Sequence, residues 1–322
     1  MKNFLAVSGK FTLFAAFVLA TCIPFFAQVG LRNAMDMDAD GKADYTIFRP
    51  SNNIWYTLKS GGGISLQTFG VANEDFMAPG DYDGDGKGDI AVWRDTNGQW
   101  YRINSLTQTF SIHGWGQTGD EPIARDYDGD GKTDMAVVRR SNGVMTWYIF
   151  RSSNNGIETR QFGVATDFTA PGDYNGDGTY DLAVQRPGAT PAAAATFFIL
   201  NSGSGSFETI TWGLSNDLVV PGDYDDDGKT DIAVIREGAT ATSDLTWVIR
   251  KSSNGQLIQK TWGVTGTDLN VQNDYDGDGQ TELAVWRNSN GRFYVFNLFN
   301  NNISVIQWGI ANDFPVASHD TH

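Results

Sequence analysis

The sequence predicts an all-β fold, a β-propeller of six four-stranded blades, with seven blades as the alternative. Three observations predict it. The chain repeats itself six times at intervals of 45 to 51 residues. Each repeat holds four short segments rich in β-branched and aromatic residues, and no helical periodicity follows the N-terminal segment. Four antiparallel strands in about 45 residues are typical of one propeller blade.

Side chains that recur in every repeat place the predicted strands. In the second repeat, strands A to D are expected at 76–80, 89–94, 99–104 and 109–115. Strand C carries a large aromatic residue, and strand D ends in aromatic-Gly. Because neighbouring blades bury both faces of each sheet, we expect these aromatic residues to pack between blades, with a sugar-stacking shelf as the alternative. Strand B ends in an arginine: Arg49, Arg94, Arg139, Arg186, Arg236 and Arg287.

A nine-residue acidic loop separates strands A and B in every repeat. Its oxygen-bearing side chains at positions 1, 3, 5 and 9 converge on one point, and Gly at position 6 lets the carbonyl of position 7 join them, as a hard cation such as calcium requires. An unmetallated Asp/Gly turn is the alternative, but carboxylates this close repel one another without a counterion. The predicted ligands are Asp36, Asp38, Asp40, Lys42, Asp44, Asp81, Asp83, Asp85, Lys87, Asp89, Asp126, Asp128, Asp130, Lys132, Asp134, Asp173, Asn175, Asp177, Thr179, Asp181, Asp223, Asp225, Asp227, Lys229, Asp231, Asp274, Asp276, Asp278, Gln280 and Glu282.

The loop is not an EF-hand, because an EF-hand needs a bidentate Glu at position 12 and flanking helices. Position 12 is apolar in all six copies and lies in the following β-rich run. The ligand set therefore closes at position 9, where strand B begins. We expect about six calcium ions with a structural role, and no other cofactor.

A second set of charged residues that recurs in the repeats predicts how the ring closes. An Asp stands six residues before five of the loops, and antiparallel pairing places it beside the strand-B arginine, either as a structural ion pair or as part of a polar ring for a ligand. The first repeat has Gly30 at this position, and the missing residue recurs as Asp313 near the C-terminus. We expect 313–319 to complete the first blade as its strand A, with Asp313 near Arg49.

The N-terminus reads as a targeting segment. Lys2 and Lys10 precede an apolar run at 11–20 and a small residue at Ala27, which predicts a signal peptide over 1–27 and a single propeller domain over 28–322. A lipid anchor at Cys22 or an uncleaved membrane anchor is the alternative. The mature chain after cleavage would hold no cysteine and no membrane span. Bound metal could then stabilise the fold outside the cell in place of disulfides.

Charge and residue types narrow the function. The formal net charge is −15, and the loop ligand positions hold 23 of the 38 acidic residues, four in five loops and three in the fourth. This acidity argues against a nucleic-acid partner, which would need a basic surface. No catalytic residue is predicted, because the three histidines, His113, His319 and His322, form no triad or zinc site with other residues. We expect His113 to be a packed or surface residue.

The motifs resemble the FG-GAP/VCBS repeat family, found in integrin α-subunits and in bacterial surface proteins. Aromatic-Gly, then Ala-Pro-Gly as at 78–80 and 170–172, then the acidic loop and an apolar strand carry this resemblance over roughly residues 30–320. It implies a propeller with calcium in the A–B loops and ligand binding on the opposite face. The sequence departs from the family in lacking a seventh loop and in Glu282, whereas Asn175 is within the family's range at position 3.

The predicted function is a secreted or cell-surface binding and adhesion module. Its partner would be an extracellular protein or glycan that meets the face opposite the calcium loops. That face carries the B–C connections, which vary in length from five residues in repeats 1, 2 and 6 to seven in repeat 3 and ten in repeats 4 and 5. A multivalent lectin and a polysaccharide-degrading enzyme are the alternatives.

Overall fold

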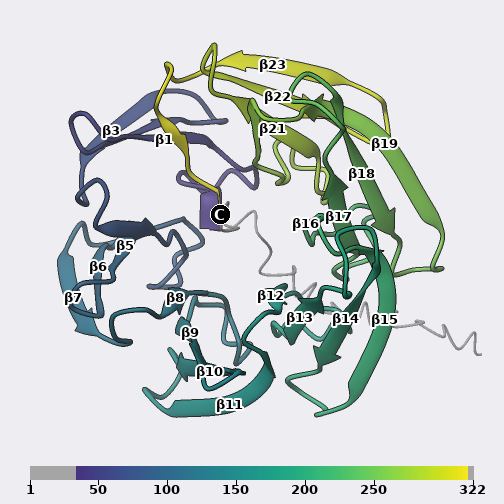
Figure 1. Ribbon diagram of the computed structural model, residues 1–322. Helices are drawn as coiled ribbons and strands as arrows, with labels where there is room; N and C mark the ends of the chain where they lie inside the picture. Colours follow the sequence, from purple (N-terminus) through teal and green to yellow (C-terminus); the bar gives the residue numbers. More distant parts are fainter. Residues whose placement is uncertain (1–33, 318–322) are drawn as a thin grey trace, which may run out of the picture.

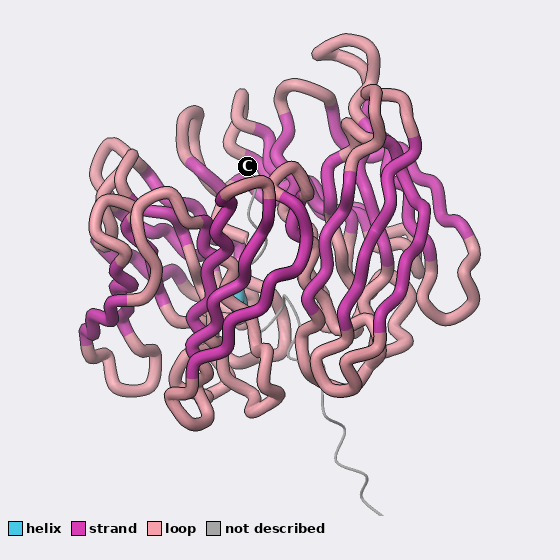
Figure 2. Tube along the Cα trace, turned by 60° about the horizontal axis from the view of Figure 1, so that its bottom comes forward, coloured by secondary structure: helices cyan, strands magenta, loops and turns pink. Residues whose placement is uncertain are grey.

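Six antiparallel sheets of four strands each form a closed ring around a central axis (Figure 1). The computed structural model describes residues 34–317, so the predicted signal peptide lies outside the described residues. The all-β fold and the six blades are as predicted. Within each blade the strands are ordered A to D from the axis outwards, and the loops lie at the two ends of the ring (Figure 2).

The blades follow one another in chain order except at the closure. Blades 1 to 3 consist of β24 (Phe314–Pro315), β1 (Tyr45–Arg49), β2 (Ile54–Leu58) and β3 (Ile64–Thr68); β4 (Asp75–Met77), β5 (Ile90–Arg94), β6 (Gln99–Ile103) and β7 (Phe110–Gly114); and β8 (Glu121–Pro122), β9 (Met135–Ser141), β10 (Val144–Phe150) and β11 (Ile157–Val164). Blades 4 to 6 consist of β12 (Phe168–Thr169), β13 (Leu182–Arg186), β14 (Ala194–Leu200) and β15 (Phe207–Leu214); β16 (Leu218–Val219), β17 (Ile232–Arg236), β18 (Asp244–Arg250) and β19 (Leu257–Val264); and β20 (Asp268–Asn270), β21 (Leu283–Arg287), β22 (Arg292–Phe296) and β23 (Ile303–Gln307).

Strand A is shorter than the sequence predicts. In blade 2 it stops at Met77, and a single bridge between Gly80 and Asp89 resumes the pairing just before the acidic loop. Pro79 lies in the gap, and it has no N–H with which to continue a ladder. Strands B, C and D of this blade match their predicted bounds to within one residue.

The C-terminal strand closes the ring as predicted. β24 pairs antiparallel with β1, with Ile47 opposite Pro315 and Phe48 opposite Phe314. Arg49 donates two hydrogen bonds to Asp313, from Nε at 2.8 Å and from Nη2 at 2.9 Å. The first blade is therefore assembled from both ends of the described chain, so its sheet can form only after the other five blades have been synthesised.

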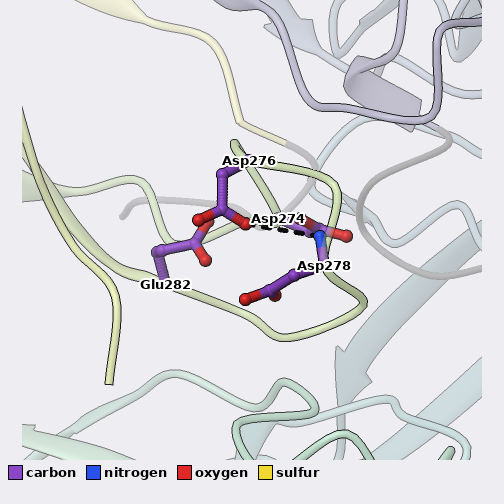
Figure 3. Close-up of side chains that lie close together, drawn as sticks. All are labelled: Asp274, Asp276, Asp278 and Glu282. Atoms are coloured by element: carbon purple, nitrogen blue, oxygen red, sulfur yellow. Dashed lines mark hydrogen bonds between the residues drawn. The ribbon is translucent and has the colours of Figure 1, made fainter. Parts of the chain in front are cut away.

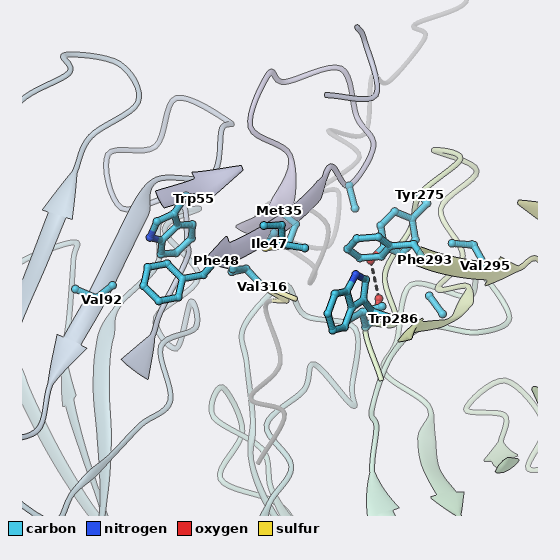
Figure 4. Packing of buried hydrophobic residues seen from close by; sticks show 13 residues of the cluster. Met35, Ile47, Phe48, Trp55, Val92, Tyr275, Trp286, Phe293, Val295 and Val316 are labelled. Atoms are coloured by element: carbon cyan, nitrogen blue, oxygen red, sulfur yellow. Dashed lines mark hydrogen bonds between the residues drawn. The ribbon is translucent and has the colours of Figure 1, made fainter. Parts of the chain in front are cut away.

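The tryptophan side chains pack within and between blades, as the sequence predicts. Six of them, Trp55, Trp93, Trp100, Trp147, Trp247 and Trp286, are at most 1% exposed. One apolar cluster joins blades 6, 1 and 2, with Ile47 and Val316 lying between Trp55 and Trp286 (Figure 4). Indole N–H groups also cross from one blade to the next, as when Trp308 donates to the carbonyl of Tyr56 at 2.9 Å. Each blade thus completes the core of its neighbour.

All six blades contain the predicted Asp–Arg pair. In each, the arginine Nε and Nη2 donate to the two carboxylate oxygens at 2.7–3.0 Å. The same carboxylate accepts the backbone N–H that follows the aromatic-Gly of the preceding strand D, as when Val71 donates to Asp75 at 2.7 Å. Each pair therefore fixes the turn from one blade into the next, in agreement with the structural interpretation.

We predict that Asp313→Ala destabilises the ring, because it removes both the Arg49 pair and the acceptor for the N–H of Ile310. Removing one partner of a mostly buried pair costs about 3 kcal/mol. Denaturant unfolding should show this loss of unfolding free energy. Glu208→Ala, at an exposed position on β15, is the control and should change it by less than about 0.5 kcal/mol. An unchanged midpoint for Asp313→Ala would contradict the closure.

Candidate metal centres

Each acidic loop is folded by its own first carboxylate. In the second loop, Asp81 Oδ1 accepts the N–H of Gly84 at 2.7 Å, and Oδ2 accepts the N–H of Gly86 at 2.9 Å. Both glycines have positive φ, 79° and 83°, a conformation that other L-residues adopt at a cost. Position 6 is Gly in all six loops and position 4 is Gly in four, with Ala39 and Asp226 also at positive φ in the other two. The backbone turn therefore explains these positions as well as ligand supply does.

The carboxylates converge in five of the six loops. In these five, one ligand atom from each of three or four acidic residues lies within 4.8 Å of the others. The clusters contain Asp36, Asp38 and Asp40; Asp81, Asp83 and Asp85; Asp126, Asp128 and Asp134; Asp223, Asp225 and Asp231; and Asp274, Asp276, Asp278 and Glu282. Figure 3 shows the four side chains of the sixth loop directed toward a common point.

The residues present fit a hard divalent cation. The donor set consists of oxygen atoms alone, which is what calcium prefers. Three position-3 carboxylates, Asp38, Asp128 and Asp225, each bury an oxygen that has no hydrogen-bond partner among the described residues. A buried unpaired carboxylate oxygen is costly, and a cation between the carboxylates would remove that cost.

Burial shifts the titration of these carboxyl groups. Desolvation raises the pKa of Asp134 and of Asp181 to about 7, and that of Glu282 to about 9, against the opposing effect of backbone hydrogen bonds. Neighbouring carboxylates add to the increase, as Asp128 does for Asp134. The groups at position 9 therefore resist ionising unless positive charge is brought to them.

Two loops differ from the others. In the fourth, Asn175 occupies position 3 and its side-chain amide donates to Asp177 at 3.1 Å, and no cluster of three acidic residues forms there among the described residues. In the sixth, the longer Glu282 stands at position 9, and the amide of Asn297 donates to Asp276, Asp278 and Glu282 at 2.8–3.1 Å. The six sites are thus not equivalent.

The sequence analysis missed the serine that contacts five of the six sites from the C–D turn. The backbone N–H of Ser105 donates to Asp89 at 2.6 Å, and its hydroxyl donates to Asp85 at 2.9 Å. Ser60, Ser152, Ser202 and Ser252 donate a backbone N–H to position 9 in the same way. The signal was a serine two residues after strand C in five repeats, which becomes meaningful once the C–D turn is known to lie beside the A–B loop.

A tyrosine at loop position 2 was also missed. Tyr82 donates its hydroxyl to the carbonyl of Ala78 at 2.8 Å, and its own N–H to Asp89 at 2.8 Å. Tyrosines in loops 3 to 6 make the same pair of bonds. This residue therefore ties the acidic loop back onto strand A.

Successive loops are joined to one another around the ring. The N–H at position 8 of each loop donates to the position-1 carbonyl of the preceding loop, at 2.6–2.8 Å, in all six blades. Thr133 makes this bond to Asp81, and it lies so close to Gly80 that an added methyl there would be 2.6 Å from Oγ1. The Gly before the loop is thus required by the approach of the next blade.

Outside the loops, His113 is packed, as predicted, with its ring centroid 4.5 Å from that of Phe150. Burial, followed by the charge of Arg102, lowers the pKa of its imidazole. His319 and His322 lie outside the described residues. Between residues 34 and 317, no helix has the length and apolar character needed to cross a membrane.

We predict that Asp128→Asn lowers stability in calcium but not in chelator. In calcium the variant loses a ligand, and a site held at about 100 times its dissociation constant contributes roughly 2.7 kcal/mol. In chelator the substitution removes one negative charge from the cluster of Asp126, Asp128 and Asp134, so thermal stability should stay constant or rise. Melting temperatures in the two conditions measure this. Equal losses in both would show that Asp128 stabilises the fold without metal.

The pH dependence of the metal-free protein provides a second prediction. Because the folded-state pKa values of Asp134 and Asp181 are raised to about 7, the folded protein binds protons that the unfolded chain releases. The resulting stability is complete below the unfolded pKa of about 4 and is lost as pH rises through about 7. In chelator, the melting temperature should therefore fall between about pH 5 and pH 8. Calcium, which binds ionised carboxylates, should reverse this trend, and a rise with pH in chelator would contradict it.

Comparisons with solved structures show the propeller fold. TolB from Acinetobacter baumannii is similar with a TM-score of 0.56 and 16% identity over 86% of this chain, which spans 66% of TolB. A triple arginine-to-alanine mutant of AofleA from Arthrobotrys oligospora is similar with a TM-score of 0.51 and 9% identity, and the match covers 90% of this chain and 91% of AofleA. An oligogalacturonate lyase in complex with manganese has a TM-score of 0.48 and 11% identity, and the match covers 80% of this chain and 74% of the lyase. A search of curated proteins found no significant match.

The family comparison identifies the repeat. The family model described as an FG-GAP-like repeat matches residues 126–184, which run from the third acidic loop through the fourth loop into β13. The other four loops have the same turn, position-9 contacts and blade order. That match and the six blades of one design closing into a ring support a β-propeller of FG-GAP/VCBS repeats.

Proposed function

We propose that this protein is a calcium-stabilised binding and adhesion module, secreted or displayed at the cell surface, for an extracellular protein or glycan. The observation that carries the proposal is that the two ends of the ring differ in structure. At one end, the acidic loops and the C–D turns bond to each other. At the other end, the B–C connections differ in length from blade to blade.

The metal is proposed to hold the fold. The carboxylates of the second loop, for example, are engaged by turn amides, by the C–D serine and by the position-2 N–H, so a bound ion would be surrounded by the chain. A closed ligand set of this kind supports folding, whereas a catalytic metal keeps an open coordination position. Calcium outside the cell would then be the condition for a stable propeller.

The two longest B–C connections are held in defined shapes. In blade 4, Gly188 donates to Ser215 Oγ at 2.7 Å, and the N–H of Ser215 donates to Ala193 at 3.0 Å. In blade 5, Gly238 and Thr265 make the equivalent bonds. Loops anchored in this way present their tips with little entropy to lose on binding, which favours recognition.

The test compares the two faces. Ala192→Arg with Thr242→Arg places bulk and charge on the exposed tips of the long B–C connections, and Leu106→Arg places the same side chain on an exposed C–D turn at the other face. Calcium-loaded wild-type protein is screened on glycan arrays and against extracellular protein libraries, and the dissociation constant of each hit is measured. We expect the double variant to weaken binding about tenfold or more, and Leu106→Arg to leave it unchanged.

The reverse pattern, with binding lost in Leu106→Arg and kept in the double variant, would contradict the proposed face. A polysaccharide-degrading enzyme is the competing function, and its sign would be release of reducing ends from a polysaccharide that wild-type protein binds. Melting temperatures of all variants in calcium control for folding.

A further inference from the structure

A cavity of about 280 Å³ lies between blades 5 and 6, beside the B–C connection of blade 5. It is lined by Asp244, Thr261, Trp262, Gly263, Val264, Val285, Arg287 and Tyr294. The lining residues lie on β18 and β19 of blade 5 and on β21 and β22 of blade 6, which are neighbouring blades in the ring (Figure 1). Two aromatic rings and three polar side chains thus surround a space the size of a small ligand.

The walls of the cavity are fixed in position. Trp262 donates its indole N–H to the carbonyl of Tyr294 at 3.1 Å, so the two blades are joined across the cavity. Arg287 lies over the Tyr294 ring at 4.5 Å and is held by Asp268, and Asn290 donates to the Tyr294 hydroxyl at 2.9 Å. A ligand would meet a preformed site, which lowers the entropic cost of binding.

Two polar side chains in the lining have no partner among the described residues, and a third is only partly used. Arg287 uses Nε and Nη2 for Asp268 and also interacts with the Tyr294 side chain, which leaves Nη1 with no carboxylate or carbonyl acceptor within residues 34–317. The carboxylate of Asp244 and the hydroxyl of Thr261 make no hydrogen bond or ion pair within residues 34–317, and both residues are exposed. The cavity therefore offers one donor, one strong acceptor and one hydroxyl beside aromatic surface.

Of the three grooves that lie between blades 3 and 4, 4 and 5, and 5 and 6, only the groove between blades 5 and 6 has this combination of side chains. In the groove between blades 4 and 5, Ala194 and Val248 stand in the places of Asp244 and Tyr294. In the groove between blades 3 and 4, the place of Asp244 is taken by Val144. The Asp–Arg pair occurs in every blade and has a structural role. Of these three grooves, the one between blades 5 and 6 is distinguished by Asp244.

We propose that this cavity binds the ring of a neutral monosaccharide, free or at the end of a glycan. The carboxylate of Asp244 would accept adjacent sugar hydroxyls, Arg287 Nη1 would donate to a sugar oxygen, and Trp262 and Tyr294 would cover the apolar face of the ring. An anionic ligand is disfavoured by Asp244, because the charge of Arg287 is already paired with Asp268. The inference rests on the proposed function and names its ligand class and subsite.

The test uses a panel of methyl glycosides of hexoses, N-acetylhexosamines and deoxyhexoses, titrated calorimetrically into full-length protein in calcium. We expect one member to bind at one site per chain. Asp244→Ala, which copies the residue in blade 4, should weaken it about tenfold or more, because a hydrogen bond to a charged acceptor is lost. Glu237→Ala, an exposed acid on the same connection, is the matched control and should bind like wild type.

Melting temperature and calcium binding should be the same in Asp244→Ala as in wild type, since the Asp244 side chain makes no hydrogen bond or ion pair within the described residues. Binding by no member of the panel, or equal affinity in Asp244→Ala and wild type, would overturn the cavity proposal. If that occurs while the tip variants of blades 4 and 5 still abolish a larger partner's binding, the proposed function stands alone. If the tip variants are also without effect, both proposals fall.

Discussion

The structure depends on bringing many carboxylates together at one end of a closed ring. Each acidic loop is bonded to the next through a position-8 N–H and a position-1 carbonyl, and the sixth loop bonds to the first. Like charges held this close repel one another, and their burial raises the pKa of groups such as Asp134. The contacts that close the ring also bring the carboxylates close together, and this links the repeat and the acidity to the proposed calcium sites.

The division of the ring into two faces follows from blade topology. With strands A to D in order, the A–B and C–D connections share one end, and the B–C and D–A connections share the other. The connections at the first end have nearly constant length and bond to one another, as the recurring Ser105-type contact to Asp89 illustrates. The second end is free to vary, and both the long connections and the cavity beside Asp244 lie there. Recognition can therefore diverge without disturbing the fold.

The sequence predicted the fold closely because its signals are local and repeated. Asp313 could be matched to Arg49, 264 residues away, only since five other repeats show the same pair at close range. Contacts between segments that the repeat does not align were missed. Ser105 beside Asp85 requires knowing that two hairpin turns meet, and Asn297 in the sixth site has no counterpart in the pattern. The cavity at Asp244 depends on packing between blades, which periodicity does not report.

The most direct measurement of the central claim is the number of calcium ions bound by the native chain. Native mass spectrometry, with calcium titrated into protein stripped by chelator, counts them without reference to any partner. The account predicts several ions per chain, up to six, with the non-equivalent fourth and sixth loops filling last. A chain that stays folded and binds no calcium at millimolar concentration would show that the carboxylates are tolerated without a counterion, and would contradict the account.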